Sequence, residues 1–166
     1  LSSSKLISYI YSADIRARHS AGYSAKMQFS DSVTPSVKGA EEIEIAFRSS
    51  KTTSFTYDEE SKLYSARQFG SGITDKLDGS AVSFRNVIAI FTRIAAYDDE
   101  GRLNIDLTTG GKGYFFCEGR YEPISWSRAS DDAPFVFTDG DGNEITFARG
   151  TTYIGIVPSN GKVTFE

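Results

Sequence analysis

Two glycine-rich segments contain the residue types most suggestive of chemistry, and the first is "LTTGGKGYFFCEGRYEPISW" at residues 107–126. Backbone N–H groups of glycine-rich turns bind phosphates, so "TGGKG" at residues 109–113 is a candidate anion site. The segment lacks the G-x-x-x-x-G-K-[ST] spacing, and a strand-like run follows where a helix should open. We therefore predict that residues 110–113 form a turn or bulge that enters the "YFFC" strand, with no anion-binding role.

The second segment, "DGDGNE" at residues 139–144, places Asp139, Asp141 and Asn143 at the spacing of the first three ligands of a calcium loop. Glu144 stands where that loop requires glycine, and no glutamate follows six residues later. The motif therefore predicts a hairpin turn with no calcium requirement, and a weak calcium site is the alternative.

The chain has one histidine and one cysteine, which limits nucleophilic and metal chemistry. His19 lies in the basic, polar stretch "RARHSAGY" and is interpreted as a solvated residue; a Ser-His-Asp triad would have to use it. Cys117, in "YFFCE", is interpreted as a small strand residue packed beside aromatic rings, because its local sequence offers no activating base or cation. We assign no catalytic residue and expect no cofactor and no metal site.

Trp126 is the residue best suited to a ligand platform, because tryptophan is favoured both in cores and at binding sites. In "ISWSR" it shares a strand face with Ile124 and Arg128, and both interpretations stay open. If the domain binds a ligand directly, we expect an aromatic platform flanked by charged donors and an acceptor. The predicted binding residues are Asp106, Lys112, Tyr114, Trp126 and Arg128.

The elements that must position these residues are mostly short strands. Residues 2–14 place Leu6, Tyr9, Ile10 and Ala13 on one helical face, whereas "EIEIAF" at 42–47 alternates as a half-buried strand does. Most later runs are short and joined by Asp- and Gly-containing turns. The pattern predicts a mainly β fold, an antiparallel barrel or sandwich with one short N-terminal helix. "VIAIF" at 87–91 is apolar throughout, which places it at the centre of the sheet, buried on both faces.

Composition is that of an ordinary globular domain. The 166 residues are 39% hydrophobic and 24% charged, with a formal net charge of -4. A net negative charge without basic clusters disfavours nucleic acid as a partner. No apolar run approaches the roughly 20 residues that span a bilayer.

Three segments, "NVIAIF", "DDEGRLNIDLTTGGKGYFFCEGRYEPISWSR" and "FTDGDGNEITFARGTTYIGIVP", occur in this order along the chain. As a set they resemble the C-terminal domain of the YerB-like lipoproteins, the domain-of-unknown-function family 3048 of Gram-positive bacteria. The similarity runs from about Ser32 to Pro158. Ile124-Ser125 departs from it, since the family usually has a small pair with glycine before the tryptophan.

The resemblance implies a division into residues 1–31, the helix and connector that end a preceding domain, and residues 32–166, the β domain. It implies a location on the extracellular face of the cytoplasmic membrane, held by a lipid anchor outside this chain. The expected partners are the preceding domain, which this chain lacks, and cell-wall material or an envelope protein.

Three functions are open, and we favour the first because the sequence has one histidine, one cysteine, no recognisable nucleophile and no metal-ligand spacing. The first is a non-catalytic binding or interaction module of a cell-surface lipoprotein. The second is part of a cell-wall-acting enzyme whose catalytic residues lie in the preceding domain or at the junction. The third is a structural brace for that domain. Residues 1 to about 31, which carry the apolar stripe, are expected either to pack on an edge of the β domain or to pair with another copy of the chain; if they do neither, they leave an exposed apolar patch.

Overall fold

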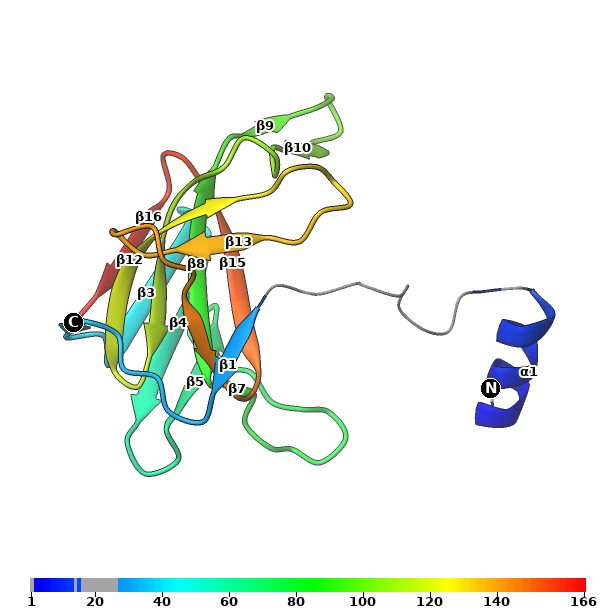
Figure 1. Ribbon diagram of the computed structural model, residues 1–166, viewed down its shortest axis with the longest axis horizontal. Coiled ribbons are helices and arrows are strands. Elements are labelled where there is room, and N and C mark those ends of the chain that lie inside the picture. Colours follow the sequence, from blue (N-terminus) through cyan, green and yellow to red (C-terminus); the bar gives the residue numbers. More distant parts are fainter. Residues whose placement is uncertain (1, 14, 16–26) are drawn as a thin grey trace.

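Two stacked β-sheets form a sandwich in the computed structural model, which describes residues 2–13, 15 and 27–166 (Figure 1). The elements, in chain order, are α1 (Ser3–Ser12), β1 (Gln28–Ser30), β2 (Val37–Lys38), β3 (Glu42–Arg48), β4 (Lys51–Asp58), β5 (Leu63–Gln68), β6 (Ser71–Gly72), β7 (Ser83–Phe84), β8 (Asn86–Thr92), β9 (Ile94–Ala96), β10 (Leu103–Ile105), β11 (Gly111–Cys117), β12 (Arg120–Ser127), β13 (Val136–Thr138), β14 (Thr146–Ala148), β15 (Thr152–Pro158) and β16 (Lys162–Phe165).

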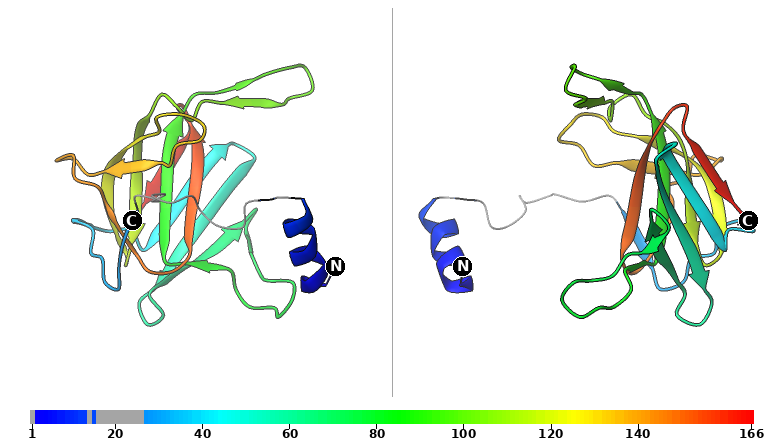
Figure 2. Two further views of the ribbon diagram at one scale, coloured as in Figure 1. Left: turned by 45° about the vertical axis from the view of Figure 1, so that its right-hand side comes forward. Right: turned by 180° about the vertical axis from the view of Figure 1, so that it is seen from behind.

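The first sheet has the strand order β13-β12-β11-β8-β15, and β2 adds to β12. The second has the order β16-β3-β4-β5-β6, and β7 adds to β5. Neither sheet closes on itself, so the predicted mainly β fold is confirmed as a sandwich and not as a closed barrel. Figure 2 shows the β9–β10 hairpin extending from one end of the sandwich.

β8 lies inside the first sheet, between β11 and β15, and is covered on both faces. Val87 and Ala89 belong to the core between the two sheets, whereas Ile88 and Ile90 belong to a second core on the outer face. Phe137 and Phe147, from β13 and β14, cover this outer core. The uninterrupted apolar run is thus explained by burial on both sides, as predicted.

A side-chain hydrogen bond and residues of positive φ form the turns of two hairpins that the sequence predicts. At the β4–β5 turn, the carboxylate of Asp58 accepts the backbone N–H of Ser61 at 2.7 Å. Glu118 and Gly119 join β11 to β12 with φ values of 52° and 67°. A two-residue hairpin turn whose twist matches that of its flanking strands requires positive φ at both of its residues.

Two strand pairs are parallel, which the pattern of short turns does not predict. β15 pairs with β8 in parallel, and β1 pairs in parallel with β14. The turn at residues 139–143 joins β13 to β14 through a single bridge between Thr138 and Glu144, and β14 then leaves β13 to pair with β1. Phe147 can thereby pack on Phe115, with ring centroids 5.6 Å apart.

α1 begins after Ser2, whose hydroxyl accepts the backbone N–H of Lys5. None of its residues is buried, and Figures 1 and 2 show it apart from the sandwich. Whether its apolar stripe is covered by the β domain or by another copy stays a prediction. The predicted boundary between residues 1–31 and the β domain at 32–166 also stays a prediction, although β1 lies before residue 32 and pairs with β14. Among the described residues, no helix is long and apolar enough to cross a membrane.

The side chain of Asn86 links the start of β8 to β14 and β15 by hydrogen bonds. Its fully buried amide donates to the Ala148 carbonyl at 2.8 Å and to Thr152 Oγ1 at 3.1 Å. Its side-chain oxygen accepts the Ala148 N–H at 3.0 Å. One side chain therefore satisfies both backbone groups of Ala148.

We expect Asn86→Ala to lower the free energy of unfolding by roughly 2–4 kcal/mol, because it leaves the buried N–H and carbonyl of Ala148 without partners. Urea unfolding followed by circular dichroism measures the loss. Asn104→Ala, on the exposed strand β10, is the matched control and should change stability by less than about 0.5 kcal/mol. Equal stability of both variants would show that the Asn86 hydrogen bonds are dispensable.

Candidate functional site

Trp126, the centre of the predicted site, lies in the outer core. Its side chain is 2% exposed and packs on Phe135, with ring centroids 5.8 Å apart. The indole Nε1–H donates to the Phe91 carbonyl at 3.1 Å. Both the ring and its polar atom are therefore used within the fold, which is the core interpretation of this residue.

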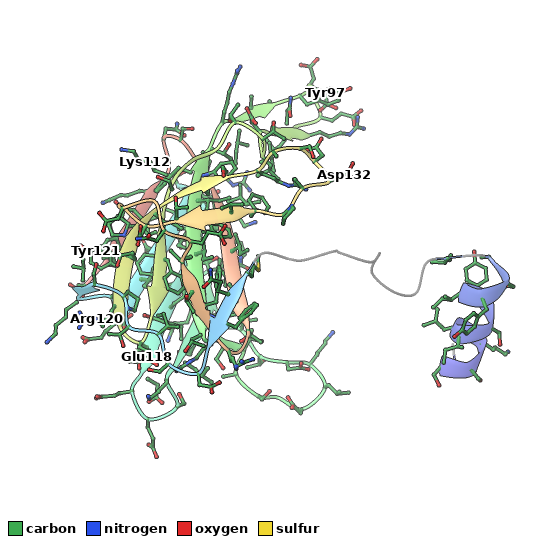
Figure 3. The ribbon with its side chains drawn as sticks, in the orientation of Figure 1. Tyr97, Lys112, Glu118, Arg120, Tyr121 and Asp132 are labelled. Carbon is green, nitrogen blue, oxygen red and sulfur yellow. The ribbon has the colours of Figure 1, made fainter. Side chains whose placement is uncertain are left out.

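Lys112 and Tyr114 point to the opposite face of the same sheet. The register pairs Gly111 with Trp126, and a Cβ at Gly111 would lie 2.8 Å from the indole Nε1, so Gly111 shares the face of Trp126. Since strand side chains alternate, the next residue, Lys112, faces the other way, as does Tyr114. Tyr114 packs on Phe165 in the core between the sheets, and Lys112 is exposed (Figure 3).

The other two predicted binding residues, Arg128 and Asp106, each have their own contacts within the fold. The Arg128 guanidinium lies 5.1 Å from the Phe135 ring centroid, and its Nε donates to the Ala133 carbonyl. The carboxylate of Asp106 accepts the backbone N–H of Thr108, which lowers its pKa. The five predicted residues do not converge on one surface, and their joint role stays a prediction.

The two glycine-rich motifs act locally as turns. Gly110 has a φ of +74°, and β11 begins at the next residue. In the second motif, Asp139 Oδ1 accepts the backbone N–H groups of Asp141 and Asn143 at 2.9 and 2.8 Å. No three His, Cys, Asp or Glu side chains among the described residues are arranged to hold a metal ion. His19 lies outside the described residues.

Cys117 is fully buried in β11, and desolvation raises the pKa of its thiol to about 12. Arg85 and Lys62 lower that pKa, but burial outweighs them. At neutral pH the side chain is a neutral thiol packed in the outer core, and such thiols are poor nucleophiles.

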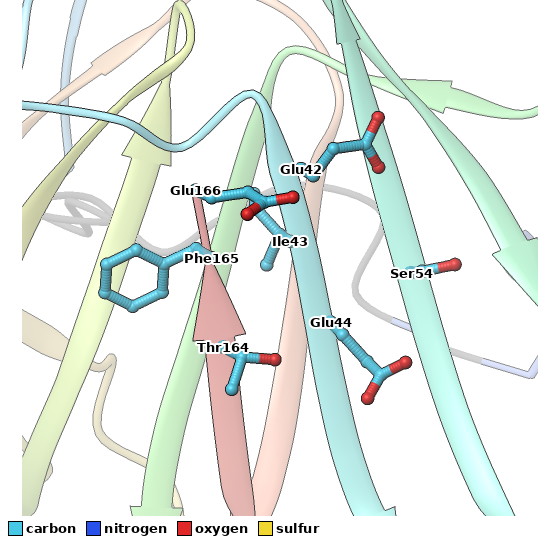
Figure 4. A pocket seen from close by; sticks show the side chains of 7 residues that line it. All are labelled: Glu42, Ile43, Glu44, Ser54, Thr164, Phe165 and Glu166. Carbon is cyan, nitrogen blue, oxygen red and sulfur yellow. The ribbon is translucent and has the colours of Figure 1, made fainter.

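Two polar hollows lie on the sandwich surface in addition to a third, of about 620 Å³, that is lined by Glu41, Tyr57, Glu59, Lys62 and Glu118. One, of about 360 Å³, is lined by Glu42, Glu44 and Glu166 together with their neighbours on β3, β4 and β16. Figure 4 shows these carboxylates directed to different parts of the hollow. The other, of about 400 Å³, is lined by residues that include Arg93, Asp106 and Asp131. Both offer charge but little apolar surface.

The surface best suited to binding is a groove of about 470 Å³ along β15, which we call the β15 groove. One side consists of five β15 residues, Tyr153, Ile154, Gly155, Ile156 and Pro158. The β9–β10 hairpin contributes Ile94, Leu103 and Ile105, and the second sheet contributes Phe47, Arg48, Lys51 and Gln68. A concave site lined mainly by apolar side chains with a few charged groups is typical of ligand sites.

β15 is an edge strand, because within residues 27–166 it pairs only with β8. Its seven residues carry no charge, and Ile154 is 40% exposed. Across the groove, Leu103 is 60% exposed. Natural edge strands are usually protected by charges, bulges or a covering segment, and an exposed apolar edge without them indicates an interaction surface.

The described residues that line the groove carry only positive charges. Arg48 and Lys51 flank the β3–β4 turn, and no acidic side chain from this part of the chain lines the groove. Lys51 Nζ lies 5.6 Å from the centroid of the Phe47 ring. Neither cation forms a salt bridge in the part of the chain that the structure describes. The groove therefore presents a positive potential beside an apolar surface.

The sequence prediction missed the β15 groove because its walls come from four separate parts of the chain. One local signal was available: "TTYIGIVP" at residues 151–158 is a strand-like run without a charged residue. A central strand and an unprotected edge strand share that pattern. Only the pairing of β15 with β8 alone distinguishes them.

Comparisons with known proteins agree on one family. A family model described as the C-terminal domain of a protein of unknown function, DUF3048, matches residues 43–154. YerB of Bacillus subtilis strain 168, named as a candidate lipoprotein, is 30% identical over 104 residues, which are 63% of this chain and 30% of YerB.

The crystal structure of YerB from Bacillus subtilis has the same fold, with a TM-score of 0.77 at 20% identity. The match covers 98% of this chain and 54% of that chain. The chain therefore spans about half of the crystallised relative, and about a third of the curated one.

We expect Trp126→Ala to lower the free energy of unfolding by roughly 3–5 kcal/mol, because it leaves a large cavity in the outer core. The measurement is the shift in the urea unfolding midpoint. Tyr97→Ala, which truncates an aromatic ring that is 71% exposed, should change stability by less than about 0.5 kcal/mol. A Trp126→Ala protein as stable as the parent would place this ring at the surface.

We expect Cys117 in the folded protein to react with a thiol reagent such as DTNB at pH 8 about a hundredfold or more slowly than in urea. The reason is that its raised pKa and burial leave little accessible thiolate, whereas an unfolded cysteine has a pKa of about 8.5. Absorbance of the released thiolate follows the reaction. Fast labelling without denaturant would mean that this part of β11 opens readily.

Proposed function

The chain belongs to the family described as the DUF3048 C-terminal domain, and from that membership we propose that it is a non-catalytic binding module of a bacterial cell-surface lipoprotein. The observation that carries the proposal is the β15 groove, where an unpaired strand edge and exposed apolar side chains lie side by side. Such surfaces cost solubility unless a partner covers them.

The chemistry of the groove supports binding rather than catalysis. Its lining offers apolar contact area, backbone groups and two cations, Arg48 and Lys51. Tyr153 lines the groove with its aromatic ring, and burial raises the pKa of its hydroxyl. General acid–base catalysis needs a group that titrates near neutral pH, and a tyrosine whose pKa is raised does not provide one.

The similarity to YerB supports a location at the cell exterior. In the proposal, the full-length protein is lipid-anchored on the extracellular face of the cytoplasmic membrane, outside the part given by this chain. The groove then faces the envelope, where its partner is the preceding domain, cell-wall material or an envelope protein.

The proposal is tested by incubating the purified chain with isolated cell envelopes of Bacillus subtilis. Bound protein is measured by co-sedimentation, and soluble sugar or peptide is measured separately in the supernatant. We expect saturable binding and no release of soluble product. Release of wall fragments would instead support an enzyme, and binding that never saturates would contradict a specific site.

A groove variant locates the binding surface. Leu103→Glu combined with Ile154→Glu places two carboxylates on exposed apolar positions of the groove, and we expect binding to weaken about tenfold or more. Leu77→Glu is the matched control, because Leu77 is 95% exposed and does not line the groove. Circular dichroism confirms that both variants remain folded. Equal binding by all three proteins would show that the β15 groove is not the site.

A further inference from the structure

We propose that the β15 groove takes an extended, acidic peptide segment, which adds to the first sheet as a strand beside β15 and directs its carboxylates toward Arg48 and Lys51. The inference rests on the proposed function and names the chemical class of the partner.

The first argument is the shape of the sandwich. Tyr153 of β15 packs on Phe55 of β4, with ring centroids 4.9 Å apart, and Gly155 lies beside Ile45 and Phe47 of β3, so the last strand of the first sheet crosses β3 and β4. The second sheet continues beyond β4 to β5, whose Gln68 also lines the groove. Within residues 27–166, no strand pairs with β15 on that side. The open position beside β15 is therefore a strand position above the second sheet.

The second argument is hydrogen bonding. An edge strand presents a row of unpaired N–H and C=O groups. An extended peptide can pair with them, because its backbone has the same rise of about 3.2–3.4 Å per residue. β15 carries no charge that would deter a partner strand, and Pro158 is its last residue. A sugar chain or a lipid tail could fill the apolar space but could not continue this ladder. The edge thus favours a peptide.

The third argument is the pattern of side chains that the groove would accept. Leu103, Ile105 and Ile154 border it on the first sheet and the hairpin, and Phe47 borders it on the second sheet. Alternate residues of an added strand would point to these two sides. The first side is apolar, whereas the second combines Phe47 with Gln68 and two cations, so the peptide residues that face the first side are apolar or β-branched.

The fourth argument is charge. Arg48 and Lys51 line the groove without salt bridges in the described part of the chain, and no acidic residue lines it. A partner with carboxylates at the end that reaches the β3–β4 turn would meet two free cations. A basic partner would meet like charges there. Complementary charges of this kind orient a partner more than they add affinity.

The test uses two N-acetylated, fluorescently labelled synthetic peptides. Each has about six residues in which valine and threonine alternate, with two aspartates at the C-terminal end in one peptide and at the N-terminal end in the other. Binding to the whole chain is measured by fluorescence anisotropy at physiological salt. At least one orientation should bind with a Kd of about 100 μM or tighter. Replacing the aspartates by lysines should weaken binding about tenfold, and methylating alternate backbone nitrogens should abolish binding.

Two further measurements assign the contact. Arg48→Gln combined with Lys51→Gln should weaken the acidic peptide about tenfold. Lys38→Gln, an exposed cation on β2, is the matched control and should leave binding unchanged. Amide hydrogen exchange should slow in β15 when the acidic peptide is present. Unchanged β15 exchange, or equal binding of the methylated peptide, would overturn strand addition.

The outcomes separate this inference from the proposed function. If no peptide binds but envelope binding is still lost in the Leu103→Glu/Ile154→Glu variant, the peptide class is wrong and the binding module stands. If the chain is a dimer whose β15 amides are already protected without peptide, a second copy occupies the groove and the inference fails. If neither envelopes nor peptides bind, both proposals fail.

Discussion

The burial of β8 on both faces is the constraint on which the rest of the structure depends. A strand with Val87 and Ala89 on one side and Ile88 and Ile90 on the other must lie inside a sheet and beneath two layers. The second sheet supplies one layer. The other requires β14 and β1 to fold back over the outer face, and Asn86 ties that layer to the start of β8 through both backbone groups of Ala148.

The same constraint explains why β15 ends at an edge. Residue Gly150, with a φ of +140°, lies between β14 on the outer layer and β15, which enters the sheet parallel to β8. A side chain is strained at that φ, and a Cβ there would lie 2.8 Å from the Cβ of Arg85. Once β15 is in place, β11 occupies the other side of β8, and the end of β5 reaches the groove beside β15 through Gln68. The groove is the part of the sandwich that this topology leaves uncovered.

Local chemistry explains which parts of the fold could be predicted from sequence. Strict alternation located β3 with Ile43 and Ile45 buried, and the helical spacing located α1 after Ser2. The parallel pairs could not be predicted, because they join residues as far apart as Phe29 and Phe147, and no local pattern records such a pairing. The five-residue binding set stays a prediction, and the arrangement of its members could not be predicted from sequence for a related reason. Adjacent strands place Lys112 and Trp126 on opposite faces, and strand register is a property of the folded sheet.

At one end of the sandwich the fold pairs its cation with other groups, and at the other end the cations are solvated by water. At the start of β8, the nearly buried Arg85 donates to the Lys62 carbonyl and pairs with Glu118, so its charge is used within the fold. Burial of an unpaired charge would cost several kcal/mol, which forces such a pairing. Arg48 and Lys51 are under no such requirement, because water solvates them. Their charges remain available to a partner, whereas the apolar edge of β15 supplies the contact area. Affinity at this end would therefore come mainly from β15 and the hairpin, and orientation would come from the two cations.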